Sequence, residues 1–406
     1  MKIIRRAPGV TRTALFWLTG FLLTAFIGLT APAARADTVL SPPIGVGPFP
    51  ERLAVTPDGK AVYVVNLNGA SVSVIDADPA SPGFNTLITT FTVDGAPTDV
   101  AIAPNGYAYV GRQGQLVNVI DTNPARPTYN TVVATINIPF LGTGSTSQVA
   151  ITPDGKRAYV TNHTAHTISV IDADPASATW NTVIYTIAAA DGLGASADPW
   201  GIAIDPNGLA YVADAAGNQV YVIDTNPASS AYNTVVRTYA DPNGAHSAAQ
   251  VAVTPNGRYV YVGHWFVNLV TVIDTVTGAF SNVDVGSASV GLAVTADGGY
   301  VYVTAYYADS VKVIDTGSNT VIDSLDVGSG PYGVAINKCY AYVTNSGNDS
   351  VSVIERSGNC SGSGSGSGGV VGGGITPVPA LNETALALLA LLLAGGAAAK
   401  AWSRTR

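Results

Sequence analysis

Short apolar segments recur along the chain from Ala54 to Glu355, always in the same order. An apolar strand is followed by a Pro-Asp-Gly or Pro-Asn-Gly turn, a Tyr-Val strand, a polar loop and a strand ending in Val-Ile-Asp. In such turns proline presets one backbone dihedral and glycine takes the positive one. A further apolar stretch, such as 181–187, predicts a fourth, outer strand in the unit.

The acidic residue that ends the repeated strand gives the period of the pattern. It falls at Asp76, Asp121, Asp172, Asp224, Asp274, Asp315 and Glu355, at intervals of 45, 51, 52, 50, 41 and 40 residues. Four short β patterns in such a period are typical of propeller blades, whereas a helical solenoid would show a 3.6-residue periodicity. We therefore predict an all-β, seven-bladed β-propeller of four-stranded antiparallel blades.

The seventh unit lacks an outer strand, because none follows Glu355. The segment 38–46 has the form of an outer strand that leads into the first unit. We predict that this N-terminal strand completes blade 7 and closes the ring, which leaves no long sheet edge exposed.

The repeated strand resembles a known motif at Tyr159-Val-Thr-Asn162, Tyr342-Val-Thr-Asn345 and Tyr302-Val-Thr304, and 327–335 resembles the stretch that joins successive blades. These segments are similar to the YVTN-repeat β-propeller family over almost all of 38–355. The resemblance implies the fold. It leaves function open, because related propellers include surface-layer proteins, binding proteins and a few enzymes.

The N-terminal segment 1–36 has a basic start, an apolar run from Ala14 to Leu29 and small residues before Asp37. These are the three parts of a secretory signal peptide. A retained membrane anchor is the alternative, although the apolar run is short for a span. We expect the mature chain to begin at Asp37 and the propeller to occupy 37–360.

The C-terminal end consists of a Gly/Ser-rich linker at 361–376 and a segment at 377–406 with an apolar stretch and a basic tail. It resembles the bacterial sorting signals of the IPTL and PEP type, with Val378-Pro-Ala-Leu381 in place of Ile-Pro-Thr-Leu. The resemblance implies processing by an exosortase-like protease. A permanent anchor helix in the membrane is the alternative. Both predict an exported protein at the cell surface.

Charge argues against a nucleic-acid partner. Residues 37–375 hold 11 Lys or Arg against 26 Asp or Glu, a net charge of −15. A protein that neutralises phosphates needs the opposite sign on one face.

The two cysteines, Cys339 and Cys360, flank the last two strands of the closing blade. In an exported chain we expect a disulfide between them, with two free thiols as the alternative.

Loops on one face of the ring carry the sequences Asp76-Ala-Asp, Asp121-Thr-Asn, Asp172-Ala-Asp and Asp224-Thr-Asn, each followed by Pro-Ala. Their oxygens suit calcium. Local turns closed by Asp and Asn are the preferred interpretation, because no loop has enough carboxylates for calcium.

The opposite face varies among the units and is the expected ligand-binding site, since polar and aromatic groups converge there on the mouth of the ring. Solvated loop tips with aromatic rings packed between blades are the alternative. At the starts of the inner strands the candidates are Arg52, Asp99, Gln148, Trp200, Gln250 and Tyr332. In the loops after Tyr-Val they are Arg112, His163, His166, Asp214, His264, Trp265, Tyr306 and Tyr307.

All four histidines, which include His246, are expected on this face, yet their spacing is weak evidence for a metal site. No nucleophile turn or phosphate loop is present. We therefore predict no metal, cofactor or catalytic residue.

The first functional hypothesis is a non-enzymatic module that binds a protein or a glycan at the cell envelope. The second is a lactonase-like hydrolase that uses Arg52, Asp99 and His264. The third is a structural surface-layer component that acts through lateral contacts.

Overall fold

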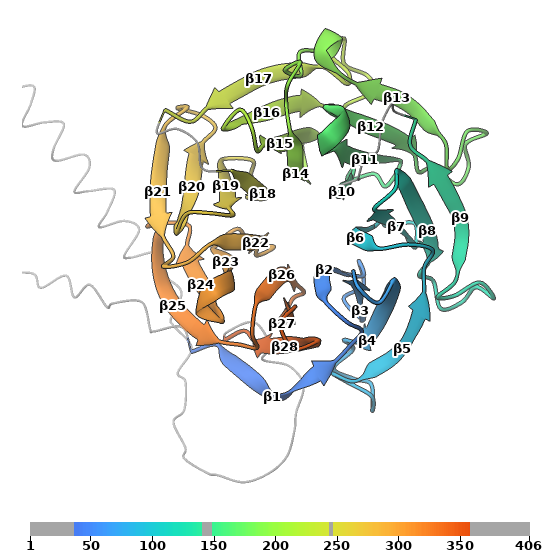
Figure 1. Ribbon diagram of the computed structural model, residues 1–406, viewed down its shortest axis with the longest axis vertical. Coiled ribbons are helices and arrows are strands. Elements are labelled where there is room, and N and C mark those ends of the chain that lie inside the picture. The colour runs from blue at the N-terminus through green and yellow to red at the C-terminus, as the bar shows by residue number, and fades with distance from the viewer. Residues whose placement is uncertain (1–35, 140–147, 243–246, 358–406) are drawn as a thin grey trace, which may run out of the picture. The chain divides into compact units, whose positions relative to one another are not determined.

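The computed structural model describes residues 36–139, 148–242 and 247–357. These ranges form seven four-stranded antiparallel sheets arranged as blades around a central axis (Figure 1). The predicted all-β, seven-bladed propeller is therefore confirmed.

Blades 1 to 6 each use four consecutive strands, and blade 7 combines the last three strands with the first. The strands are β1 (Thr38–Gly45), β2 (Pro50–Val55), β3 (Ala61–Asn66), β4 (Ser71–Asp76), β5 (Leu87–Thr92), β6 (Pro97–Ile102), β7 (Tyr107–Arg112), β8 (Leu116–Asp121), β9 (Val132–Asn137), β10 (Val149–Ile151), β11 (Arg157–Asn162), β12 (Thr167–Asp172), β13 (Val183–Ile187), β14 (Pro199–Ile204), β15 (Leu209–Asp214), β16 (Gln219–Asp224), β17 (Val235–Ala240), β18 (Ala248–Val253), β19 (Tyr259–His264), β20 (Leu269–Asp274), β21 (Phe280–Asp284), β22 (Ser289–Val294), β23 (Tyr300–Ala305), β24 (Ser310–Asp315), β25 (Thr320–Asp326), β26 (Pro331–Ile336), β27 (Tyr340–Asn345) and β28 (Ser350–Glu355). Three short 3₁₀ helices are η1 (His163–Ala165), η2 (Ala189–Asp191) and η3 (Tyr306–Ala308).

The ring closes through the two ends of the described chain. Strand β1 pairs antiparallel with β28, with Thr38 opposite Glu355 and Gly45 opposite Ser350. In Figure 1 the blue β1 lies along the outer side of the red-orange β28. The predicted closure of blade 7 by the N-terminal strand is therefore confirmed. A register shift between Leu40 and Ile44 interrupts the pairing.

The hydrophobic core lies between the blades. Seven clusters of buried side chains each combine residues of two neighbouring blades, and one of them joins blade 7 to blade 1. Strand β3, for example, is buried at all six positions because a neighbouring blade covers each of its faces. Such strands are continuously apolar, whereas the outermost strands alternate between half-buried and exposed residues.

In five blades a tyrosine on the second strand links the blade to the next one. Its hydroxyl donates to an Asn Oδ1 in the loop between the third and fourth strands of the following blade. The pairs are Tyr63 to Asn130 (2.5 Å), Tyr109 to Asn181 (3.1 Å), Tyr159 to Asn233 (2.6 Å), Tyr261 to Asn319 (2.7 Å) and Tyr342 to Asn85 (3.1 Å). These asparagines have φ between 52° and 61°, the left-handed conformation that Asn tolerates better than most residues.

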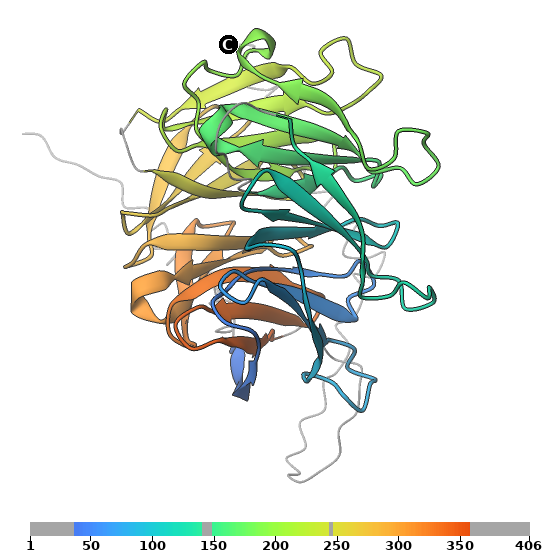
Figure 2. The same cartoon turned by 45° about the vertical axis from the view of Figure 1, so that its right-hand side comes forward.

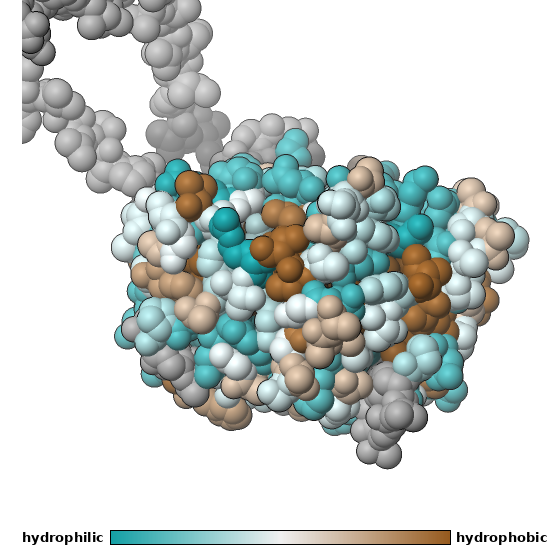
Figure 3. Space-filling model, turned by 90° about the horizontal axis from the view of Figure 1, so that it is seen from above, coloured by the Kyte–Doolittle hydropathy of each residue, from teal (hydrophilic) through white to brown (hydrophobic). Residues whose placement is uncertain are grey.

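The two faces of the ring differ in their loops. Long loops after the third strands of blades 1 to 4 project from one face (Figure 2). Figure 3 shows one side of the rim, where apolar side chains gather in separate patches among hydrophilic ones. The exposed apolar residues of the outermost strands are Leu87, Ile88, Val132, Val133, Ile184, Tyr185, Val236 and Ile322.

Several predictions fall wholly or partly outside the described residues: the signal peptide, the linker, the sorting segment and Cys360. The described ranges hold one cysteine, Cys339, so no disulfide exists within them and its predicted bond to Cys360 is not confirmed. The predicted anchor helix also lies outside. No helix within the described ranges is long and apolar enough to cross a membrane.

Candidate functional site

The candidate site is built around the starts of the seven innermost strands, which all begin on one face of the ring. We call this the entry face. It also carries the loops between second and third strands, such as η1 and η3. One position near the start of each innermost strand, the inner-ring position, is held in blade order by Arg52, Asp99, Gln148, Gly201, Gln250, Gly291 and Gly333.

Three inner-ring positions require glycine because neighbouring innermost strands approach closely there. A Cβ at Gly291 would lie 2.2 Å from the carbonyl oxygen of Tyr332, and one at Gly333 would lie 2.5 Å from that of Glu51. A Cβ at Gly201 would lie 2.7 Å from the Cα of Gln250. The obstacles are backbone atoms, which cannot rotate away as a side chain does.

The other inner-ring positions use side-chain oxygens to hold the next blade. Asp99 Oδ2 accepts a hydrogen bond from the Val149 N–H (2.8 Å), and Gln148 Oε1 accepts one from the Ile202 N–H (3.1 Å). Gln250 Oε1 accepts one from the Leu292 N–H (2.9 Å). Some of the polar side chains that led us to predict a binding site therefore connect neighbouring blades.

Arg52 links blade 1 to blade 5. Its Nη1 donates a short hydrogen bond to Gln250 Oε1, and its guanidinium lies 5.3 Å from the ring centroid of Tyr332. Its side chain is only 5% exposed. Three of the predicted site residues, Arg52, Gln250 and Tyr332, are thus in direct contact.

Six aromatic rings extend this contact into a continuous arc, which we call the aromatic arc. It runs through blades 3 to 7, and each ring contacts the next. The centroid distances are 4.6 Å for His163 to Trp200, 6.4 Å for Trp200 to Trp265, 5.5 Å for Trp265 to Tyr332, 6.3 Å for Tyr332 to Tyr306 and 5.0 Å for Tyr306 to Tyr307. The first five are half-buried, and Tyr307 is 76% exposed. The arc brings together predicted residues from five blades.

Two carboxyl groups lie beside Arg52. Burial raises the pKa of Asp99 to about 6, against the lowering effect of Arg52. Burial likewise raises the pKa of Glu51 from 4.5 to about 7, and the charge of Asp99 adds to the rise while Arg52 opposes it. Burial and the charge of Glu51 also raise the pKa of the Tyr332 phenol. Desolvation disfavours the charged forms more than one guanidinium favours them.

Three predicted site residues, His264, Arg112 and Asp214, occupy the position of the Asn in Tyr-Val-Thr-Asn, at the end of the second strand. Blade 3 keeps the asparagine there, and Asn162 Nδ2 donates to Thr167 (3.2 Å) and Ser169 (3.0 Å) of the third strand. His264 holds this position in blade 5, where its Nε2 lies 2.9 Å from Thr271 Oγ1, and it is only 4% exposed. His264 therefore takes over the strand-linking role of Asn162.

The other two are Arg112 and Asp214. Arg112 Nη2 lies 3.3 Å from Asp94 Oδ2, and the Asp214 carboxylate accepts hydrogen bonds from the Asp198 and Gly217 N–H groups, both at 2.9 Å. Their contacts hold entry-face loops in place.

The histidines do not form a metal centre among the described residues. His163 Nδ1 lies 3.4 Å from Asp198 Oδ1, and His166 Nδ1 lies 2.6 Å from the Ala197 carbonyl oxygen. His246 lies outside the described ranges. No group of three His, Cys, Asp or Glu in the described part of the chain is arranged to hold a metal ion.

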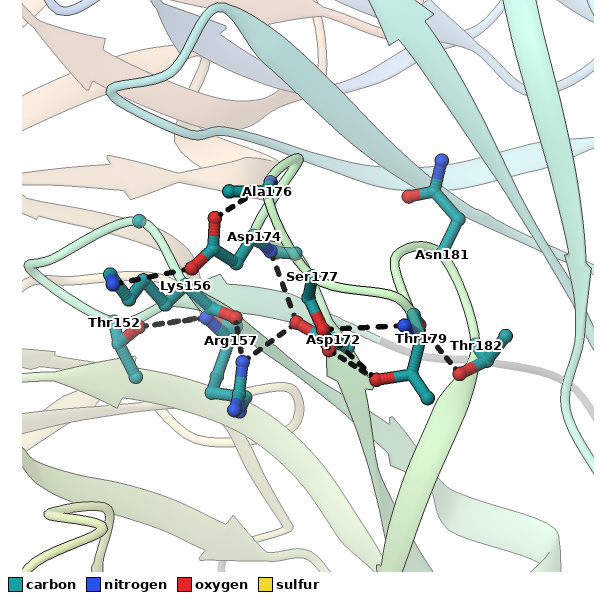
Figure 4. A network of polar contacts seen from close by, with 12 residues as sticks. Thr152, Lys156, Arg157, Asp172, Asp174, Ala176, Ser177, Thr179, Asn181 and Thr182 are labelled. Atoms are coloured by element: carbon teal, nitrogen blue, oxygen red, sulfur yellow. Dashed lines mark hydrogen bonds and ion pairs between the residues drawn. The ribbon is translucent and has the colours of Figure 1, made fainter.

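The Asp-rich loops of the opposite face are closed turns. In blade 3 the Asp172 carboxylate accepts hydrogen bonds from the hydroxyls of Ser177 and Thr179 (2.5 and 2.6 Å) and forms an ion pair with Arg157 (2.7 Å). Figure 4 shows this network, in which Lys156 also pairs with Asp174 (3.2 Å). The oxygens considered for calcium are used by the loop itself, as the turn interpretation expected.

Sequence reasoning missed one member of the site, Glu51. It precedes Arg52 in the sequence. Trp200 and Tyr332 hold the same repeat position in other blades, and they were recognised because they are aromatic. The only available signal was this shared position, directly after the proline that starts the strand.

Comparison with known proteins identifies a C-terminal sorting motif and confirms the fold. Residues 376–406 match the model of the IPTL-CTERM motif, a C-terminal sorting signal consistent with export and surface localisation. The predicted resemblance of the tail is therefore confirmed, while the YVTN-repeat assignment stays a prediction. No curated protein matches the chain.

Two solved structures resemble the propeller. Hydrazine synthase of Kuenenia stuttgartiensis is 20% identical, with a TM-score of 0.61 over 76% of this chain and 96% of that one. A streptogramin B lyase is 13% identical, with a TM-score of 0.62 over 79% and 97%. Such low identities establish a shared fold and no shared activity. The chain is thus a seven-bladed β-propeller with a C-terminal sorting motif.

Proposed function

We propose that this protein is a non-enzymatic binding module of the cell envelope, and that the entry face binds a protein or a glycan through the aromatic arc. The observation that carries the proposal is the continuous series of five contacts among six rings, across five blades. A row of half-buried rings offers flat apolar surfaces with polar edges, which is the combination that binding sites use for area and orientation.

The sequence supports display at the cell surface. A signal peptide would export the chain, and the IPTL-CTERM motif would direct its C-terminus to an exosortase-like protease at the membrane. The Gly/Ser-rich sequence of 361–376 would connect the propeller to this segment as a linker.

The hydrolase hypothesis has weaker support. It needs Arg52, Asp99 and His264 within hydrogen-bonding reach of one another. Arg52 and Asp99 are electrostatic neighbours, but the hydrogen bonds described for His264 are with Thr271 and, through its backbone N–H, with Ser289. We therefore do not propose a catalytic role.

A structural surface-layer role is the second candidate, and the apolar rim favours it. Pairs of exposed apolar residues, such as Leu87 with Ile88 and Val132 with Val133, lie on the outermost strands. Lateral packing of rims would bury them. Assembly of the purified exported protein into sheets, checked by electron microscopy and light scattering, would favour this role over the first.

Tryptophan fluorescence tests the main proposal, because Trp200 and Trp265 belong to the arc. The purified exported protein is titrated with soluble envelope polysaccharide and with a panel of defined oligosaccharides and peptides. We expect saturable quenching that Trp265→Ala and Tyr332→Ala weaken at least tenfold.

The matched control is Trp180→Phe, because Trp180 packs against Tyr107 (5.1 Å) in a loop of the opposite face. Quenching that survives both arc variants, or that Trp180→Phe abolishes, would contradict the proposal.

A further inference from the structure

The Glu51 carboxylate, close to Arg52 and Tyr332, accepts no hydrogen bond from the described residues. Its backbone carbonyl accepts from Thr344 Oγ1 (2.6 Å), while its side chain interacts electrostatically with Arg52, Asp99 and Tyr332. Asp99, by contrast, has a hydrogen bond from Val149. A half-buried carboxylate without a donor points to a group supplied from outside.

The charges around Glu51 do not balance when both carboxyls are ionised. Glu51 on β2 and Asp99 on β6 are acidic, Arg52 on β2 is the cationic neighbour, and Tyr332 on β26 and Tyr306 on η3 are phenols. Arg52 already donates to the neutral Gln250 and lies over Tyr332. One additional positive charge would neutralise this group.

A second unpartnered group lies at the inner ring. The Gln148 amide is only 3% exposed, and its Nε2 has no hydrogen-bond partner among the described residues. Its orientation is set because its Oε1 accepts from the Ile202 N–H. A buried donor without an acceptor costs free energy unless a ligand or water supplies one.

We propose that the entry face takes a ligand with an alkylammonium group, which lies between the Glu51 carboxylate and the rings of the aromatic arc, and with a hydrogen-bond acceptor for the inner ring. This inference rests on the proposed function and names its ligand class. An ammonium group is attracted by aromatic faces and, in a partly desolvated site, by a carboxylate. The chemistry is shared by quaternary ammonium headgroups and by lysine side chains.

Binding depends on pH in a defined direction. The ammonium is attracted to ionised Glu51, and protonation of Glu51 competes with it. Because burial raises the pKa of Glu51 to about 7 and that of Asp99 to about 6, affinity increases as pH rises from 5.5 to 8.

The test uses two pairs of probes, and the two members of each pair differ mainly in charge. Choline is compared with its neutral isostere 3,3-dimethylbutan-1-ol, and a lysine-containing peptide is compared with the same peptide acetylated on Nζ. Trp200 and Trp265 report binding to the purified exported protein at pH 5.5 and pH 8. We expect at least a tenfold preference for the charged member of one pair at pH 8, and a smaller preference at pH 5.5. The pair that shows it tells a quaternary ammonium source from a lysine source.

Two variants link the preference to the site. Glu51→Gln is expected to reduce the preference about tenfold while thermal melting confirms that the ring is folded, and Trp180→Phe is expected to leave it unchanged. Asp99→Asn, which can still accept from Val149, is a second variant that should also weaken the preference. Equal affinity for charged and neutral probes, or a preference that persists in both variants, would overturn the inference.

The failure of this inference differs from the failure of the proposed function. If charged and neutral probes quench the arc tryptophans equally, the arc binds ligands but does not select ammonium groups. If none of the four probes binds, the ammonium inference is wrong, and the polysaccharide titration still decides the function.

Discussion

The Tyr302 hydroxyl donates a short hydrogen bond to Asp37 Oδ2, and the two residues are 265 positions apart in the sequence. In five other blades the same tyrosine donates to an asparagine of the following blade. Blade 7 has no such loop because its outer strand comes from the N-terminus. Asp37, the expected first residue of the mature chain, therefore takes the place of the asparagine.

We predict that Asp37→Ala destabilises the ring. Asp37 Oδ1 also accepts from the Ser357 N–H and hydroxyl (2.8 and 3.1 Å), so the variant leaves the buried Tyr302 hydroxyl and these donors without their acceptor. The expected loss is about 1–3 kcal/mol in the free energy of unfolding. Urea denaturation of the exported protein measures it. Asp37→Asn should lose less, since asparagine serves in the other blades; equal losses for the two variants would refute this explanation.

Deletion of 37–47 should open the ring. Without β1 the backbone groups of β28 lose their partners, and residues such as Ile44 leave the cluster between blades 7 and 1. We expect a clear drop in melting temperature and concentration-dependent aggregation through the exposed edge. Differential scanning calorimetry and light scattering test this, and an unchanged melting temperature would refute the role of β1 in closure.

Gly291→Ala should destabilise the inner ring by about 1–3 kcal/mol, the usual cost of overpacking. The new Cβ would meet the Tyr332 carbonyl oxygen at 2.2 Å, so the innermost strands of blades 6 and 7 must separate. Gly45→Ala on β1 is the control, because nothing lies within 4 Å of a Cβ there. Chemical denaturation of both variants should separate them, and a neutral Gly291→Ala would contradict the close approach.

Glu51→Gln should raise stability at high pH and change it little at low pH. Because the folded-state pKa of Glu51 is about 7 and its ordinary value is 4.5, the folded protein binds the proton more tightly. This contribution is therefore present below about pH 4.5 and is lost as pH rises toward 7. At pH 8 the variant should exceed the wild type by about 1–3 kcal/mol. Urea denaturation from pH 4.5 to 8 measures the difference, and a constant difference would disagree with the raised pKa.

His264→Asn should fold with nearly wild-type stability, because asparagine at the same repeat position in other blades donates to the third strand. His264→Ala removes the contact with Thr271 and should cost about 1–2 kcal/mol. Thermal melting compares the two. If His264→Asn instead abolished ligand binding without loss of stability, His264 would belong to the binding site.

The structure brings some of the predicted site residues together and places others apart, for a physical reason. Trp200, Trp265 and Tyr332 were recognised because large aromatic residues interrupt an otherwise regular repeat. His264 and Arg112 interrupt it equally, yet their side chains are buried in contacts within or beside their own blades. The sequence identifies residues that deviate from a repeat. It does not show whether such a residue contacts a ligand or replaces a side chain that links two strands.

The number of blades, the strand order and the closure by the N-terminal strand were determined by the sequence itself, because the apolar period and the turn residues act locally and repeat. The tertiary structure alone decided that Tyr302 meets Asp37, that Arg52 reaches Gln250 and that Glu51 lies beside the aromatic arc. These relationships join blades that are far apart in the chain. They depend on how closely the innermost strands approach around the ring, a distance that no local pattern specifies.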